Sequence, residues 1–318
     1  MANIVLLGRC NLKCPYCFAE DFTSSQSADF DMSSLDEVLN FIAPDGEVGL
    51  IGGEPLIYKS IDTVLDILKD DMRFRRVTLF TNGVFIDKHI DSLLFPKLSI
   101  LINLNSSEDI GKANFDRIDS NIELLCERGM AQNVTLGINI YKENQSFDEF
   151  VSIANKYGFK RVRFSVSIPQ DKSCGAIPYF EKMKPTLLRF YEIMKENGIA
   201  PCPDCNIIPE CVYTPEELAF IDTVPCFSQR EEALLLGKAS VCSPIIDIYP
   251  DLCAARCFGC YDDIKVSIKG FKSISDLRNY FFMWIDSVRV HKPVREACKD
   301  CYKFNTFACY GACICYKK

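Results

Sequence analysis

Histidine and long apolar runs are scarce in this chain of 318 residues, and its acidic residues outnumber its basic ones. Its two histidines, His89 and His291, are too few to favour zinc or non-haem iron sites built on imidazole. No apolar run approaches the roughly 20 residues of a membrane span, and the N-terminal residues lack the basic region and cleavage site of a signal peptide. The net charge of −7 argues against a nucleic-acid surface. We therefore expect a cytoplasmic protein with neither a membrane nor a nucleic-acid partner.

Cysteine, by contrast, is abundant, with 18 residues. Three of them lie between positions 10 and 17 and thirteen between 202 and 315, whereas Cys126 and Cys174 stand apart. Cytosolic thiols stay reduced, so a cysteine-dense segment in such a protein favours metal binding over disulfides. Ligation by thiolates alone is typical of iron–sulfur clusters.

The densest signal is Cys10-Asn-Leu-Lys-Cys14-Pro-Tyr-Cys17, which follows the apolar run at 4–7. The run predicts a short buried strand, and the cysteines then lie on the loop that leaves it. Three thiolates on one loop can bind three irons of a [4Fe–4S] cube and leave the fourth iron open to a small molecule. A zinc knuckle is the alternative interpretation of the same spacing.

This C-x3-C-x2-C spacing, with Tyr16 before the last cysteine, resembles the radical S-adenosylmethionine (radical SAM) superfamily. The resemblance implies that Cys10, Cys14 and Cys17 hold the cluster and that S-adenosylmethionine (SAM) chelates the open iron. It also implies reductive cleavage of SAM to methionine and a 5′-deoxyadenosyl radical, which abstracts a hydrogen atom from the substrate. Tyr16 is expected near the adenine.

A second motif, Gly52-Gly53-Glu54-Pro55, ends the apolar run at 48–51. Paired glycines let the backbone turn sharply and present its polar groups to a ligand. In the radical SAM superfamily, a G-G-E-P segment after the second strand contacts the amino group of SAM. The resemblance therefore assigns Gly52 to Pro55 to cofactor binding, in place of an ordinary Gly-Gly turn.

Strand and helix patterns alternate through the first 198 residues. Strands are predicted at 4–7, 48–51, 77–80, 98–104, 134–141 and 161–168, with helices at 34–41, 61–68, 90–94, 115–127, 147–157 and 183–197. Strict alternation predicts a parallel sheet with right-handed crossovers. The fold class is α/β, and the resemblance implies a partial (β/α)6 TIM-like barrel over residues 1–198.

Parallel barrels place their sites at the carboxyl ends of the strands. Polar residues at those ends are therefore candidates for contacts with the cofactor or the substrate, although a turn or a cap explains each of them equally well. They are Asn103, Asn105, Ser106, Asn139 and Ser165.

Two isolated cysteines have different expected roles. Cys126 lies beside Leu124 and Leu125 in a predicted helix and is expected to be structural. Cys174 follows the sixth predicted strand, where a thiol can donate a hydrogen atom to a substrate radical. An ordinary loop cysteine is the alternative for Cys174.

Residues 199–318 resemble the cysteine-rich α+β SPASM and twitch extensions, which bind one or two auxiliary [4Fe–4S] clusters. The resemblance departs from the family pattern at Leu252, which replaces a glycine, and in the seven-residue spacer after Cys301. It implies one cluster on Cys242, Cys257 and Cys313 with Cys253 or Cys260, and another on Cys298, Cys301, Cys309 and Cys315. A twitch pattern would instead use Cys242, Cys257, Cys298 and Cys301 for a single cluster. No role follows for Cys202, Cys205, Cys211 and Cys226, and a structural zinc ribbon is the alternative for the whole segment.

The resemblance implies an enzyme that matures a ribosomally made peptide by crosslinking, epimerisation or oxidation. Expected partners are the peptide and a reductant such as flavodoxin or ferredoxin. Few residues precede Cys10, so the peptide is expected to dock on the barrel or to come with a separate leader-binding partner. One alternative is a radical SAM dehydrogenase or carbon-skeleton enzyme acting on a small molecule. Another is a non-catalytic iron–sulfur or zinc protein.

Overall fold

The computed structural model describes residues 1–17, 22–23, 28–169, 173–238, 242, 245–260 and 264–317. Their mutual contacts define two units. The first unit comprises Met1–Thr135 and Pro244–Phe282, and the second comprises Leu136–Ser243 and Met283–Lys318. The domain boundary that the sequence predicts after residue 198 stays a prediction.

The first unit holds a mostly parallel sheet in the order β10-β9-β8-β1-β2-β3-β4. Its parallel strands are β1 (Ala2–Val5), β2 (Glu47–Ile51), β3 (Arg76–Thr81), β4 (Leu98–Asn103) and β8 (Ile246–Ile248). The edge is antiparallel and consists of β9 (Cys253–Ala255) and β10 (Lys265–Ser267).

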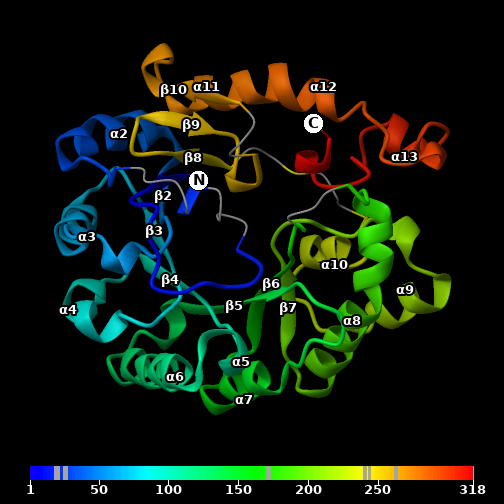
Figure 1. The fold of residues 1–318 in the computed structure, drawn as a ribbon, viewed down its shortest axis with the longest axis horizontal. Helices are drawn as coiled ribbons and strands as arrows, with labels where there is room; N and C mark the ends of the chain where they lie inside the picture. Colours follow the sequence, from blue (N-terminus) through cyan, green and yellow to red (C-terminus); the bar gives the residue numbers. More distant parts are fainter. Residues whose placement is uncertain are drawn as a thin grey trace. The chain divides into compact units, whose positions relative to one another are not determined.

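Amphipathic helices follow the strands of the first unit. They are α2 (Leu35–Ile42), α3 (Ile61–Asp70), α4 (Ile90–Leu93), α5 (Ser107–Ile110), α6 (Lys112–Glu127) and α11 (Ile274–Phe281). In α3, buried Ile61, Val64, Leu65 and Leu68 recur at helical spacing, which gives the helix one apolar stripe to pack. In Figure 1, α2, α3, α4 and α6 lie along the outer side of strands β1 to β4.

The second unit contains the parallel strands β5 (Val134–Ile140), β6 (Arg161–Val166) and β7 (Ala200–Pro203). Its helices are α7 (Asp148–Lys156), α8 (Ala176–Glu196), α9 (Pro215–Ile221), α10 (Gln229–Leu235), α12 (Ser287–Arg289) and α13 (Tyr302–Asn305). A π-helical stretch spans Phe282–Asp286. None of the helices that the structure describes combines the length and apolar character needed to cross a bilayer.

All six predicted strands are strands, and all six predicted helices are helices. The sixth predicted helix, α8, starts seven residues before its predicted start at 183 and contains Pro185 in its interior. Helical stretches predicted near 216–221 and 274–285 correspond to α9 and α11, whereas strands β7 to β10 and helices α5, α10, α12 and α13 were not predicted.

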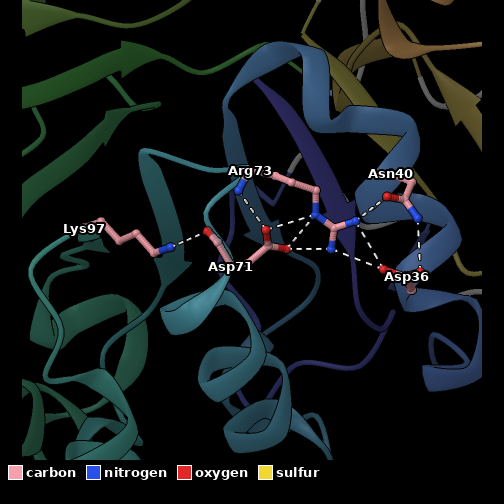
Figure 2. Close-up of polar contacts among 5 residues, drawn as sticks. All are labelled: Asp36, Asn40, Asp71, Arg73 and Lys97. Atoms are coloured by element: carbon pink, nitrogen blue, oxygen red, sulfur yellow. Dashed lines mark hydrogen bonds and ion pairs between the residues drawn. The ribbon is translucent and has the colours of Figure 1, made fainter.

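The guanidinium of Arg73 joins α2 to the turn after α3 (Figure 2). It donates to both carboxylate oxygens of Asp71, at 2.7–3.0 Å, and to Asp36 Oδ1 of α2 at 3.2 Å. It also donates to Asn40, and Lys97 Nζ donates to the Asp71 carbonyl at 2.6 Å. Partial burial works to raise the pKa of Asp71, but Arg73 outweighs it and the pKa is lowered. These contacts fix the start of β3 against α2.

A buried polar pair joins β8 to β1. Asn3 Nδ2 donates to Asp247 Oδ1 at 2.6 Å, and both side chains are almost fully buried. A Cβ on Gly49 of the neighbouring strand β2 would stand 2.0 Å from Asn3 Oδ1, so the pair also explains this strand glycine. Burial raises the pKa of Asp247 from 3.8 to about 7, against the opposing hydrogen bonds from Asn3 and from the backbone of Phe258.

This raised pKa predicts a stability that falls with rising pH. The folded state holds the Asp247 proton to a higher pH than the unfolded chain, so the loss spans the range from 3.8 to about 7. We expect Asp247→Asn to remove this pH dependence, which amounts to a change on the order of a few kcal/mol in the free energy of unfolding. The reason is that a neutral amide does not titrate and can donate to Asn3 Oδ1. Urea unfolding at about pH 5 and about pH 8 measures the slope, and equal slopes in wild type and variant would contradict the assignment.

Candidate cluster and cofactor site

The three N-terminal cysteines lie on the loop that leaves β1, as predicted. Leu6 and Leu7 continue the buried path of the strand, and Leu6 N donates to Ile51 O at 2.9 Å. A turn between Cys14 O and Cys17 N, at 3.1 Å, closes the cysteine segment. The thiol of Cys14 lies within electrostatic range of both Cys10 and Cys17, so the structure brings the three predicted ligands together.

The loop disfavours ionised thiols until a cation is present. Burial raises the pKa of Cys14 to about 12, and the neighbouring thiolates of Cys10 and Cys17 and the carboxylate of Asp109 raise it further. Burial is also the largest cause of the raised pKa of Cys10. A cationic iron centre supplies the charge that three clustered thiolates need, and its binding displaces their protons. The donor set therefore fits an iron–sulfur cluster.

Three N–H groups approach the sulfur atoms. Leu12 N lies 3.5 Å and Asn82 Nδ2 lies 3.9 Å from Cys10 Sγ, and Asn105 Nδ2 lies 3.6 Å from Cys14 Sγ. Hydrogen bonds to cluster sulfurs stabilise the reduced cluster and tune its potential. Asn82 was not among the predicted site residues, although it directly follows β3 and so lies at a strand end.

The Gly52-Gly53 backbone packs directly against the chain that enters the cysteine loop. Gly53 N donates to Leu7 O and Glu54 N donates to Arg9 O, both at 2.9 Å. A Cβ on Gly53 would stand 2.1 Å from Arg9 O, and one on Gly52 would stand 2.6 Å from Leu7 O. Only glycine permits this approach, which fixes the start of the cysteine loop.

The Glu54 carboxylate is fully buried and accepts three hydrogen bonds. Oε1 accepts from Leu56 N at 3.0 Å and from Thr81 Oγ1 at 2.7 Å, and Oε2 accepts from Asn82 N at 2.7 Å. Burial raises the pKa of Glu54, and these donors oppose the shift. Asn82 in turn donates to Asn11 Oδ1 at 2.9 Å, so Glu54 orients the end of β3 toward the cysteine loop.

The remaining strand-end candidates divide into different environments. Asn105 is 5% exposed, and its Oδ1 accepts no hydrogen bond from any residue that the structure describes. Ser106 caps α5 by accepting from Asp109 N at 3.3 Å, and Asn103 closes β4. In the second unit, Ser165 Oγ donates to Asn139 Oδ1 at 2.7 Å, so these two candidates bind each other. Of the five, Asn105 has the environment that best fits a cofactor contact.

Tyr16 is half-buried on the cysteine loop. Cys174 is exposed, and its thiol lies 3.5 Å from the carbonyl of Gly175 at the start of α8. Cys126 is half-buried on α6. The roles predicted for Tyr16 and Cys174 stay predictions.

The C-terminal cysteines are distributed over both units. Cys253, Cys257 and Cys260 belong to the first unit, and the others belong to the second. In the second unit, Cys205 lies within electrostatic range of Cys313 and Cys242, and Cys211 lies within range of Cys298, Cys301 and Cys309. The sulfurs of Cys313 and Cys315 lie 3.2 Å apart. The predicted ligand sets therefore stay predictions, and two cysteines without a predicted role lie close to their members.

Two other cysteines without a predicted role have polar neighbours of another kind. Cys202 Sγ accepts from Arg161 Nη2 at 3.2 Å, and Cys226 lies beside the carboxylates of Glu232 and Glu231. Within the described part of the chain, no three His, Cys, Asp or Glu side chains converge on a site for a single metal ion. A [4Fe–4S] cube needs no such convergence, since each thiolate binds a different iron.

The glycine contact predicts the effect of one added methyl group. Gly53→Ala forces its Cβ against the backbone of Arg9 and Gly8, and we expect a loss of about 1–3 kcal/mol in stability together with loss of iron from the N-terminal loop. Gly270→Ala is the matched control, because no described atom lies within 4 Å of its Cβ position. Urea unfolding and iron analysis of both variants test this, and a Gly53→Ala protein with the iron content of the control would refute it.

Comparisons with known proteins agree with this geometry. The family model of the radical SAM superfamily matches residues 4–155. Among curated relatives, the GTP 3′,8-cyclase of Chlorobaculum tepidum is 32% identical over 94 residues, which cover 29% of this chain and 28% of the cyclase. The GTP 3′,8-cyclase of Vibrio vulnificus is 26% identical over 194 residues, or 58% of this chain and 52% of the cyclase. The matched segments therefore span about half, or less, of these relatives.

Two solved structures share the fold over nearly the whole chain. Streptococcus suis SuiB bound to S-adenosylmethionine gives a TM-score of 0.61 at 16% identity, covering 99% of this chain and 69% of SuiB. Native anSMEcpe with bound AdoMet gives a TM-score of 0.65 at 16% identity, covering 98% of this chain and 89% of anSMEcpe. SuiB was also solved with the precursor peptide SuiA, and anSMEcpe with the Cp18Cys peptide.

These comparisons confirm the predicted fold class, an α/β partial barrel with a mostly parallel sheet and a C-terminal cysteine-rich region that includes antiparallel strands. The cysteine loop, the glycine contact and the family model lie in the same part of the chain. By this match, residues 4–155 of the chain belong to the radical SAM superfamily.

Proposed function

We propose that this protein is a radical SAM enzyme that abstracts a hydrogen atom from a peptide and so matures a ribosomally made peptide. The observation that carries the proposal is the cysteine loop itself, with three thiols gathered on one turn and N–H groups aimed at two of their sulfurs. When bound, the cluster and SAM supply the reductive cleavage that yields methionine and a 5′-deoxyadenosyl radical.

The chain's own residues bind and orient these groups. Cys10, Cys14 and Cys17 hold the cluster, and Tyr16 packs near the adenine. The backbone of Gly52, Gly53 and Pro55 positions the methionine end of SAM. The carboxylate of Glu54 is occupied by three protein donors, so its role is to hold that backbone in place. Asn105 Oδ1 is the free acceptor beside Cys14 for a polar group of the cofactor.

A peptide substrate is supported by the two fold relatives, which were both solved with peptides. The proposal includes a reductant such as flavodoxin or ferredoxin, a separate leader-binding partner and a cytoplasmic location. It also includes the domain boundary near residue 198, one or two auxiliary [4Fe–4S] clusters, and Cys174 as a hydrogen donor.

The second candidate is a radical SAM enzyme for a small molecule. It is favoured by one observation: the curated sequence relatives are GTP 3′,8-cyclases. The two candidates differ in what accelerates SAM cleavage. A peptide encoded beside this gene should stimulate it in the first case, and GTP or another small molecule should do so in the second.

The proposed function predicts 5′-deoxyadenosine formation by anaerobically reconstituted, reduced protein. Replacing Cys10, Cys14 and Cys17 with Ala should abolish the product, because no thiolate then remains to hold the cluster. Cys126→Ala, on α6, is the matched control and should retain wild-type turnover. Chromatography of the nucleoside product measures the rate. A wild-type protein that binds iron yet forms no 5′-deoxyadenosine would favour the non-catalytic alternative.

A further inference from the structure

Four thiols gather in the second unit, away from the N-terminal cysteine loop. Three of them, Cys298, Cys301 and Cys309, come from the last 21 residues of the chain. The fourth, Cys211, comes from the segment after β7, and no role was predicted for it. It lies within electrostatic range of all three.

The local backbone holds the three C-terminal thiols together. Cys301 N donates to Cys298 O at 3.2 Å, and Cys309 N donates to the carbonyl of Lys303 at 3.0 Å. Gly311 N donates to Cys309 Sγ at 3.1 Å, and a Cβ on Gly311 would stand 3.8 Å from Cys298 Sγ. Gly311 therefore lies between Cys298 and Cys309, with a φ of +78° that favours glycine.

Independent contacts attach Cys211 to the same place. Cys211 is the centre of a 3₁₀ turn at Glu210–Val212, and the carboxylate of Glu210 pairs with Lys303 of α13. On the other side, Lys184 Nζ donates to Val212 O at 3.1 Å and pairs with Glu217 at 2.9 Å. The ion pair of Glu210 thus joins the turn that carries Cys211 to the helix between Cys301 and Cys309.

Two cations border this group of thiols. Arg295 lies within electrostatic range of Cys211. The buried Nε of Arg295 donates no hydrogen bond to any described residue. Lys317 lies within electrostatic range of Cys298 and Cys309. N–H donors and positive charge beside four thiolates are what an anionic iron–sulfur cluster requires.

We propose that Cys211 is the fourth ligand of an auxiliary [4Fe–4S] cluster held by Cys298, Cys301 and Cys309. The sequence pattern had assigned this place to Cys315, whose sulfur lies 3.2 Å from that of Cys313. Four thiolates close the coordination of the cube, so this cluster carries electrons and binds no substrate. The inference rests on the proposed function only for the presence of auxiliary clusters.

The test is an iron and sulfide analysis with Mössbauer and EPR spectra, in full-length protein with Cys10, Cys14 and Cys17 all replaced by Ala. In this background, Cys211→Ala should lose roughly four irons or convert one cluster to a [3Fe–4S] form. Cys226→Ala is the matched control, an exposed cysteine whose neighbours are carboxylates, and it should lose none. Full iron content and unchanged spectra in Cys211→Ala would overturn the assignment.

Double variants identify the cluster to which Cys211 belongs. Cys309→Ala should remove the same irons, so adding Cys211→Ala to it should remove no more. Further iron loss in that double variant would place Cys211 in another cluster and overturn the proposal. Cys211→Ser retains a small polar ligand, and we expect it to keep the cluster with altered EPR features, which separates lost ligation from misfolding.

Failure of this inference is distinguishable from failure of the proposed function. The background protein tests the auxiliary cluster by its iron, and the wild-type protein tests SAM cleavage by its 5′-deoxyadenosine. A background protein without iron would overturn the role of Cys211 even where wild-type cleavage of SAM is intact.

Discussion

The buried carboxylate of Glu54 is the constraint on which the N-terminal site depends. A carboxylate removed from water is strongly destabilising unless donors replace the lost hydration. Here the donors are Leu56 N, the Thr81 hydroxyl and Asn82 N, which come from the residues just after β2 and from the end of β3. Any displacement of either strand end would leave part of this charge unsatisfied. The requirement to satisfy Glu54 therefore holds two strand ends in register.

The consequence reaches the cysteine loop by two routes. Through its backbone, Glu54 donates to Arg9 O, one residue before Cys10. The Glu54 carboxylate also accepts the backbone N–H of Asn82 and so holds that residue in place. The side-chain amide of Asn82 donates to Asn11, and its Nδ2 lies 3.9 Å from Cys10 Sγ. The glycines complete this arrangement, because they allow the two backbones to meet without a side chain between them. One four-residue motif thus positions the loop that carries the thiols.

Much of the barrel was predictable from sequence because its information is local. The apolar runs of β1 to β6 and the apolar stripes of their helices are visible in short windows. Strand β7 was missed because Pro201 and Pro203 argue against a strand. It is an edge strand that pairs only with β6, and prolines are tolerated in edge strands. Strand β8 has three residues and pairs with β1, more than 240 residues earlier in the chain. Such pairing has no local signal.

In the candidate site, too, some residues have a local signal in the sequence and others do not. The three cysteines and the G-G-E-P segment were found from spacing, whereas Asn11 and Asn82 act through contacts across 71 residues of sequence. Ser106, Asn139 and Ser165 looked equivalent to Asn105 as polar residues at strand ends. The structure separates them, since hydrogen bonds within the protein engage the first three, while Asn105 retains a buried acceptor.

The two thiol groups differ in how the chain assembles them, and the difference suits different chemistry. The N-terminal group comes from one loop of eight residues, so few degrees of freedom are lost in forming it and a position on the cube stays open. The C-terminal group joins Cys211 to residues 87 to 98 positions later, which closes a long loop. A metal that closes a long loop stabilises the folded state most, because it removes the most freedom from the unfolded chain. The second group therefore combines closed coordination with a structural role.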